Sequence, residues 1–270
     1  MPLSRAGSPL ESRPARLISY LTPGYPVELF EVLAEHVGAD LRLQTGRSGP
    51  DPSDDPFAAG TADIGWLCST SLIELTTGRP ASVQEVGVAW VPDDPDAADR
   101  PVYYSDVMVP ADSTARTLDD LRGLRIGCND PASLSGYHAL RIELDRRDHV
   151  PSRFASLVMT GSHHRSLEQL LAGDLDAAVI DSIVRTRRAR ETPGIAGLRV
   201  IERLGPWPTQ PVVMRIDATP IEVSTVRNAL LEANDDPRVM QILRSAALTR
   251  LAATGPGHCD AVRTAMLGKS

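Results

Sequence analysis

Apolar residues along the chain alternate between short continuous runs and longer stretches with helical spacing. The run at 16–20 is typical of a buried strand, and apolar positions recur at helical spacing over 27–37. Further strands are expected at 40–44, 62–67, 83–91, 124–128, 156–160, 176–180 and 198–201, and further helices at 72–77, 135–147, 161–172, directly after 181, and at 220–233, 239–253 and 258–267. Such alternation is typical of parallel strands covered on both faces by helices, so the pattern predicts an α/β fold.

Two extended segments, 102–109 and 210–215, interrupt this alternation and are expected to cross between two α/β units. We therefore predict a two-lobed α/β molecule whose two mixed sheets are joined by a double-strand hinge. The predicted lobes are 15–106 together with 213–270, and 107–212. Residues 1–14 are rich in proline, serine and arginine and are expected to form a flexible leader.

Length and charge narrow the class of protein. At roughly 150 residues per domain, 270 residues suffice for about two domains. The net charge of −7 argues against a nucleic-acid partner, because such binders are usually basic. Aromatic residues make up only 4% of the chain, so a ligand pocket must depend mainly on polar side chains and backbone groups.

The first residues of the chain indicate in which compartment the protein is expected. It shows neither the apolar core nor the small-residue cleavage site of a signal peptide, and no cysteine that could carry a lipid anchor. No run of 18 apolar residues is present either, so no membrane span is expected. The sequence as written predicts a cytoplasmic protein, or an extracytoplasmic one if its natural start lies upstream.

Motifs for catalysis and metal binding are scarce. Cys68, Cys128 and Cys259 are too few and too scattered for a disulfide framework or a zinc site, and buried, reduced thiols are expected. Cys68 and Cys128 stand near strand ends and could act as nucleophiles only with a partner that is distant in sequence. The adjacent His163 and His164 point about 100° apart on a helix and cannot readily share a metal. We therefore predict no catalytic residue, no metal ion and no cofactor, although enzyme activity stays open.

Hydroxyl-rich segments follow three of the predicted strands and directly precede helices. They are Ser69-Thr70-Ser71, Ser133-Leu134-Ser135-Gly136 and Gly161-Ser162-His163. Ligands of open α/β sheets lie beyond the carboxyl ends of the strands, where helix starts offer free N–H groups and a positive dipole end. Serine and threonine are also ordinary helix caps, but three such junctions in succession favour a bound oxyanion.

Further polar and aromatic residues are expected on the same rim. Asp181 ends a strand and suits a ligand with a cationic or hydroxyl end, although it could equally cap the next helix. Tyr20, Tyr25 and Trp66 could wall a cleft in the first lobe, with core packing the alternative for Trp66. The helix after Asp181 carries arginines on several faces, which are expected to form a solvated surface rather than an anion site: Arg185, Arg187, Arg188 and Arg190.

The strongest motifs lie between 103 and 181. Tyr103-Tyr104, then Leu118-Asp-Asp-Leu-Arg-Gly-Leu-Arg-Ile-Gly127 and Asp130-Pro-Ala-Ser-Leu-Ser-Gly136 together resemble the phosphate/phosphonate-binding (PhnD-like) family of ABC-transporter solute receptors. Gly161-Ser162-His163 and Gly173-Asp-Leu-Asp-Ala-Ala-Val-Ile-Asp181 extend the resemblance, as does Ala62-Asp-Ile-Gly65. It departs from the family at Leu134, where a threonine is common, at His164, which is often acidic, and over 67–77, where an aromatic residue is missing.

This resemblance implies a type II periplasmic-binding-protein fold that closes two lobes on a small oxyanion: a phosphonate, a phosphate ester or phosphate. It also implies ABC-type uptake, with a permease as partner. The family's anion-binding positions correspond to Ser133, Ser135 and His163, joined by Ser69, Thr70 or Ser71 from the first lobe, and its acidic ligand contact corresponds to Asp181. Tyr20 completes the predicted site. The alternative is a cytoplasmic enzyme or ligand sensor on the same scaffold, similar to pyrimidine-precursor synthases or futalosine-pathway enzymes.

Overall fold

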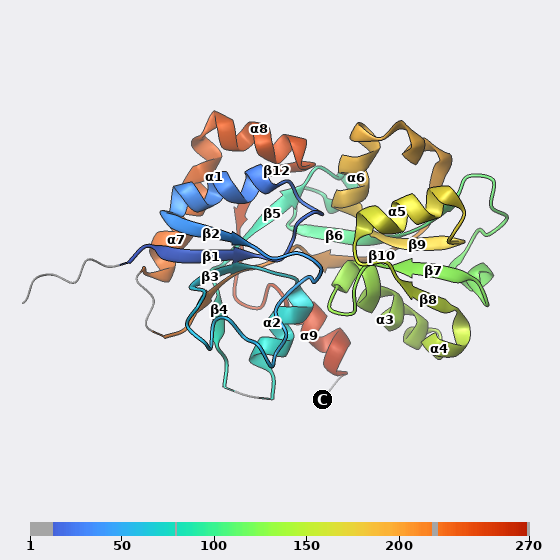
Figure 1. Ribbon diagram of the computed structural model, residues 1–270, viewed down its shortest axis with the longest axis horizontal. Coiled ribbons are helices and arrows are strands. Elements are labelled where there is room, and N and C mark those ends of the chain that lie inside the picture. Colours follow the sequence, from blue (N-terminus) through green and yellow to red (C-terminus); the bar gives the residue numbers. More distant parts are fainter. Residues whose placement is uncertain (1–12, 79, 218–220, 269–270) are drawn as a thin grey trace, which may run out of the picture.

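The computed structural model describes residues 13–78, 80–217 and 221–268. Two α/β lobes lie side by side, and each is built on its own five-stranded sheet (Figure 1). The sheet of the first lobe has the strand order β2-β1-β3-β11-β4, and that of the second has the order β10-β6-β9-β7-β8. Both sheets are mixed, as predicted.

The first lobe combines elements from both ends of the chain. Its sheet contains β1 (Ala15–Ser19), β2 (Ala39–Leu43), β3 (Ile64–Trp66), β4 (Val83–Glu85) and β11 (Val212–Arg215), and a separate pair is formed by β5 (Val88–Pro92) and β12 (Leu248–Ala253). Its helices are α1 (Val27–Val37), α2 (Ser69–Thr76), α7 (Val223–Glu232), α8 (Pro237–Ser245) and α9 (Asp260–Leu267). β1 pairs in parallel with β2 and β3, whereas β11 runs antiparallel to β3 and β4.

The second lobe is continuous in sequence. Its strands are β6 (Val102–Pro110), β7 (Arg125–Cys128), β8 (Ser156–Met159), β9 (Ala177–Asp181) and β10 (Leu198–Pro208), and its helices are α3 (Ala139–Arg146), α4 (Pro151–Phe154), α5 (His163–Ala172) and α6 (Ser182–Glu191). A π-helical turn, η3 (Leu134–His138), leads into α3. Short 3-10 turns in the described part of the chain are η1 (Pro95–Ala97), η2 (Leu118–Leu121), η4 (Pro193–Gly197) and η5 (Ala233–Asp235).

Two antiparallel strands connect the lobes. β6 pairs with β10 along its whole length. Val102 lies opposite Pro208 and Pro110 lies opposite Leu198, with register shifts in between. The strand predicted at 198–201 therefore extends to Pro208. The lobe boundaries at 107 and 212 remain a prediction about which residues move together. The predicted leader, 1–14, lies outside the described residues except for Arg13 and Pro14, and Arg13 pairs with the buried carboxylate of Asp63.

Two of the predicted elements are wrong. The expected helix over 239–253 ends at Ser245, and Leu248–Ala253 forms β12, antiparallel to β5. Ala247 has a φ of 59°, which breaks the helix, and buried Leu248 and Leu251 face the core of the first lobe. The expected strand 83–91 is divided at Gly87, whose φ of 79° favours glycine, so that β4 and β5 enter different sheets.

Aromatic residues fill the core of the first lobe near the junction. Trp66 and Trp90 stack with their rings 5.2 Å apart, and Phe30 packs edge-on against both. Trp66 is fully buried, so it packs in the core rather than walling a cleft. Tyr25, from the loop after β1, also stacks on Trp90, with the ring centroids 4.7 Å apart.

Candidate ligand-binding site

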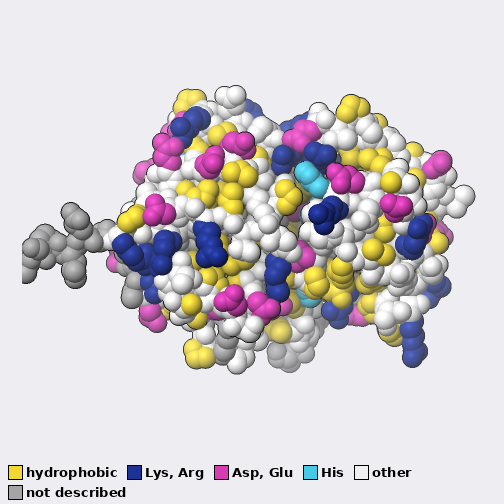
Figure 2. All heavy atoms as spheres, in the orientation of Figure 1, with side chains coloured by type: hydrophobic (Ala, Val, Ile, Leu, Met, Phe, Trp, Pro, Cys, Tyr) yellow, Lys and Arg dark blue, Asp and Glu magenta, His cyan; other side chains and the backbone are white. Residues whose placement is uncertain are grey.

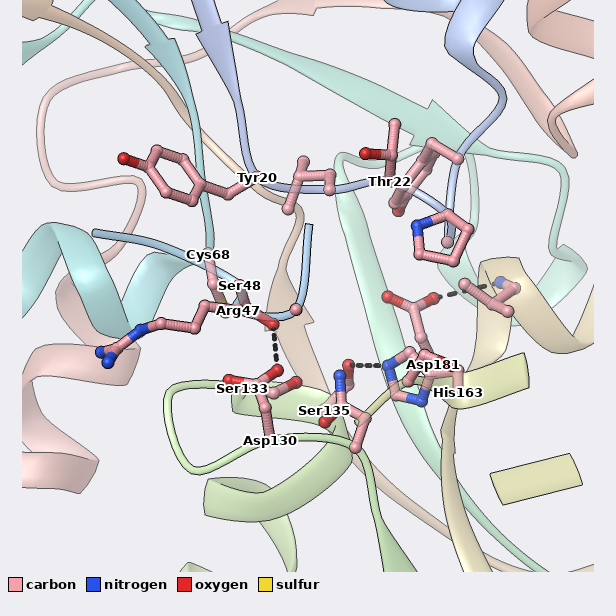
Figure 3. A pocket seen from close by; sticks show the side chains of 18 of the residues that line it. Tyr20, Thr22, Arg47, Ser48, Cys68, Asp130, Ser133, Ser135, His163 and Asp181 are labelled. Carbon is pink, nitrogen blue, oxygen red and sulfur yellow. Dashed lines mark hydrogen bonds between the residues drawn. The ribbon is translucent and has the colours of Figure 1, made fainter. Parts of the chain in front are cut away.

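A small cavity of about 50 Å³ lies between the lobes (Figure 3). First-lobe residues reach it from the loops after β1 (20–25) and β2 (46–48) and from Cys68 after β3. Second-lobe residues reach it from 129–135 after β7, from 161–163 after β8 and from Asp181 at the end of β9. These are the carboxyl ends of parallel strands, where ligands of open α/β sheets bind. A water-sized group needs about 10–15 Å³ by this measure, so the cavity admits roughly three to five such groups.

The wall from the second lobe holds three of the predicted site residues close together. Ser133 caps the turn η3 by accepting a hydrogen bond from the Gly136 N–H at 3.1 Å. The Ser135 hydroxyl faces the imidazole of His163, with Oγ and Nε2 3.5 Å apart. Burial lowers the pKa of His163 to about 3, so its ring is neutral near pH 7 and can donate or accept a hydrogen bond without carrying charge.

Asp181 also lines this wall, and it serves as a helix cap at the same time. Its Oδ1 accepts hydrogen bonds from the N–H groups of Ile183 (2.8 Å) and Val184 (3.3 Å) at the start of α6. Burial raises the pKa of Asp181 to about 7, and the nearby carboxylate of Asp106 adds to this rise. Near neutral pH its carboxyl group is therefore divided between the charged and the protonated form.

Gln210 is a site residue that sequence reasoning missed. It lies between β10 and β11, where the chain returns to the first lobe, and its side-chain N–H donates to Asp181 Oδ2 at 3.1 Å. Its amide oxygen accepts hydrogen bonds from Tyr25 (3.0 Å) and Trp90 (2.9 Å), which fixes the orientation of the amide. No motif marks this position, because its partners come from three distant segments.

The wall from the first lobe consists mainly of loop backbone with a few polar side chains. Tyr20 lines the cavity as predicted, and burial raises its pKa to about 12. Ser48 donates a hydrogen bond to Asp130 of the second lobe at 2.6 Å, which closes one side of the cavity. Among the described residues, the buried hydroxyl of Thr22 has no hydrogen-bond partner, so it is free to bind a ligand.

Ser69, Thr70 and Ser71 are fully buried, but they do not line the cavity. All three lie inside the first turn of α2, and the Thr70 hydroxyl donates to the Ala132 carbonyl of the second lobe. The cap of α2 is Cys68, which does line the cavity and accepts a hydrogen bond from the Leu134 N–H at 3.2 Å. Burial raises the pKa of Cys68, which keeps it in the thiol form near neutral pH.

The electrostatic character of the cavity comes from dipoles more than from full charges. The turn η3 and helices α5 and α6 begin at residues that line it: Ser133, Ser162 and Asp181. Helix starts present free N–H groups and the positive end of the helix dipole. Of the described lining residues, Arg47 alone carries a full positive charge, and it is exposed at the rim, paired with Asp51.

Two α/β lobes with a polar cavity between them have the fold of type II periplasmic binding proteins. The sequence matches the family model of the ABC transporter, phosphonate, periplasmic substrate-binding protein over residues 27–256. The chain therefore belongs to this family, whose membership implies a small solute as ligand and a permease as partner. A search of curated proteins found no significant match.

Several solved structures share this fold. A binding protein component of an ABC phosphonate transporter from Pseudomonas aeruginosa is 17% identical, with a TM-score of 0.75 over 94% of this chain and 86% of that one. PhnD1 from Prochlorococcus marinus, in complex with methylphosphonate, is 14% identical, with a TM-score of 0.75 over 96% and 100%. XAC2383 from Xanthomonas citri, bound to ATP, is 16% identical, with a TM-score of 0.68 over 94% and 97%.

Within 13–78, 80–217 and 221–268, no three or more His, Cys, Asp or Glu side chains are grouped so that they could hold a metal ion. Across the same ranges, no helix combines the length and the apolar character that a membrane crossing requires.

Proposed function

We propose that the protein binds a small oxyanion, foremost a phosphonate, in the cavity between its lobes and delivers it to an ABC permease. The observation that carries this proposal is the convergence of Ser133, Ser135 and the free hydroxyl of Thr22 with three helix starts around one cavity. Hydroxyl and backbone donors suit an anion that is bound without a buried counter-charge.

The size and charge of the cavity support a compact ligand. About 50 Å³ suits a group with three or four oxygen atoms and leaves little room for a nucleotide. Asp181 and Asp130 both line the cavity, and carboxylates repel a fully ionised ligand. A phosphonate that carries a proton or an ammonium group fits these carboxyl groups better than a bare dianion does. The complex of PhnD1 with methylphosphonate is in line with this choice.

A thermal-shift screen followed by calorimetric titration tests the proposal. Methylphosphonate and phosphate are expected to raise the melting temperature, because a ligand that binds only the folded state stabilises it. Glucose, a neutral solute with similar hydrogen-bonding groups, is the control and is expected to have no effect. A response to the sugar and none to either oxyanion would contradict the proposal.

The variant Asp181→Asn tests which end of the ligand meets this residue. If the ligand carries a cationic group there, removal of the carboxylate weakens binding, so affinity for an aminoalkylphosphonate falls. For methylphosphonate, which has no cationic group, relief of repulsion is expected to strengthen binding at pH 8, where Asp181 is ionised. Titration of both ligands against both proteins separates the two cases.

A further inference from the structure

Helix α6 carries four arginines, and they bind in two different ways. Arg185 pairs with Asp106, and Arg188 pairs with Glu191, so both stay within the second lobe. Arg187 and Arg190 instead reach the first lobe. The sequence predicted a solvated arginine surface on this helix, whereas all four side chains have protein partners. Figure 2 shows basic and acidic side chains gathered at the border between the lobes, over the region of α5 and α6.

Arg187 holds the loop that forms one wall of the cavity. Its Nη1 donates to the carbonyl of Gly24 at 3.1 Å and lies 3.5 Å from that of Pro23. The neighbouring residues Thr22 and Tyr25 line the cavity. Nε of Arg187 bonds to Glu191 at 2.9 Å, which orients the guanidinium, and the side chain is only 16% exposed. This arginine therefore positions the wall without facing the ligand.

Arg190 binds the first lobe at a second point, further along the same helix. Its guanidinium donates to the carbonyl of Arg244, at 2.9 Å, and pairs with the carboxylate of Asp93. The Asp93 N–H in turn bonds to the Ala247 carbonyl, so both partners belong to one connected part of the first lobe. This pair is about half exposed and contributes less than the contacts of Arg187.

We infer that Arg187 and Arg190 form a clasp between the lobes that holds the closed form from outside the cavity and so sets the affinity for the ligand. α6 begins at Asp181, a cavity residue, and ends at these contacts, so one rigid helix links the site to the clasp. The measured dissociation constant equals the intrinsic one divided by the closed fraction of the free protein. Loss of the clasp lowers that fraction without removing any contact to the ligand.

The test compares Arg187→Ala and Arg190→Ala with the matched control Arg188→Ala on the same helix. Small-angle scattering of the ligand-free protein reports the open fraction, and the labelling rate of Cys68 by a thiol reagent reports access to the cavity. Cys128 and Cys259 are buried inside the lobes, so Cys68 dominates the early labelling. We expect Cys68 labelling to accelerate about 5-fold in Arg187→Ala and about 2-fold in Arg190→Ala, with Arg188→Ala unchanged.

An independent variant from the other lobe guards against effects on the folding of α6. Asp93→Asn removes the charged one of the two first-lobe partners of Arg190, and it is expected to change scattering and labelling in the same direction as Arg190→Ala, by no more than that variant does. The affinity for methylphosphonate, which rests on the proposed function, is expected to weaken by the ratio of the closed fractions that scattering gives for wild type and variant. Wild type that binds no oxyanion would refute the proposed function alone. Unchanged scattering and labelling in Arg187→Ala and Asp93→Asn would overturn the clasp.

Discussion

Ser69-Thr70-Ser71 and Ser133-Leu134-Ser135 both follow a buried strand at the start of a helical segment, yet only Ser133 and Ser135 line the cavity. In the first lobe, α2 starts at Ser69, so all three hydroxyls lie within the helix and pack against neighbouring segments. In the second lobe the chain turns before the helix, and Ser133 becomes the cap with a free face toward the cavity. Ser135 lies inside its helical turn, as Ser69 lies inside α2, and it still lines the cavity, so the packing of each segment decides which hydroxyl faces the ligand site.

The two walls also differ in what they present. The second lobe supplies the neutral imidazole of His163, the carboxyl group of Asp181 and the starts of α5 and α6. The first lobe supplies loop backbone, Tyr20, Thr22 and the thiol of Cys68. The second-lobe wall therefore holds most of the polar side chains and helix starts that suit an anion. Four experiments test this contrast.

The largest expected effect is on the pH dependence of stability. Because burial raises the pKa of Asp181 to about 7, its stabilising contribution is present in acid and is lost as the pH rises through 7. The pKa of His163 is lowered to about 3, so this residue destabilises the fold as the pH falls below about 6.5. The two contributions oppose each other in wild type between about pH 4.5 and 6.5.

Single variants should separate the opposing effects of Asp181 and His163 on how the free energy of unfolding changes with pH. Relative to wild type, the free energy of unfolding of Asp181→Asn is expected to rise by up to about 1.4 kcal/mol per pH unit between pH 4.5 and 6.5. His163→Asn should show the reverse trend. Urea unfolding at several pH values measures both, with Thr22→Val from the first-lobe wall as the control. If the free energy of unfolding of both second-lobe variants changed with pH in parallel with that of wild type, the shifted pKa values of Asp181 and His163 would be contradicted.

The second effect concerns ligand affinity. Ser133→Ala and Ser135→Ala each remove a donor that can reach a charged oxygen, and such a bond is worth about 1.5–3 kcal/mol. Affinity for methylphosphonate is expected to weaken by roughly 10- to 150-fold in each, measured by titration calorimetry. The first-lobe counterparts Ser69→Ala and Ser71→Ala should leave affinity within about 2-fold. Equal losses in both pairs would abolish the contrast between the lobes.

The third experiment, the variant Gly136→Ala, tests how tightly the second-lobe wall is packed. A Cβ on Gly136 would lie 1.9 Å from Asn129 Oδ1 and 2.9 Å from His163 Cε1, so Gly136→Ala must displace cavity residues. Overpacking of this kind costs about 1–3 kcal/mol of stability. Gly197→Ala is the matched control, because nothing lies within 4 Å of its Cβ. Thermal melts and titration of both variants should show losses of stability and affinity in Gly136→Ala alone.

The smallest effect concerns the cap of α2. Cys68→Ser places a hydroxyl where the first lobe now presents a thiol, and serine is a strong helix cap. Affinity for methylphosphonate is expected to improve by about 2- to 5-fold, since the wall gains a donor that a thiol supplies poorly. Titration measures the change. A clear loss of affinity instead would show that the bond from Leu134 to the sulfur matters more than donor strength.

Much of the fold could be predicted from local pattern. The alternation of strands and helices and the cavity positions of Ser133, Ser135, His163 and Asp181 follow from apolar periodicity and from polar residues at strand ends. The motifs between 103 and 181 are likewise short and contiguous, and the family they resemble is the one to which the chain belongs.

Other features were decided only by the tertiary structure. Leu248–Ala253 became a strand because β5 lies beside it. Gln210 entered the site because Tyr25, Trp90 and Asp181 meet around it. The partners of Arg187 and Arg190 lie more than 50 residues away in sequence, in the other lobe. By itself the sequence determined which segments form strands and helices, because those preferences act over a few residues. Which polar groups face the cavity, and which arginines join the lobes, depends on contacts between distant segments that no local pattern records.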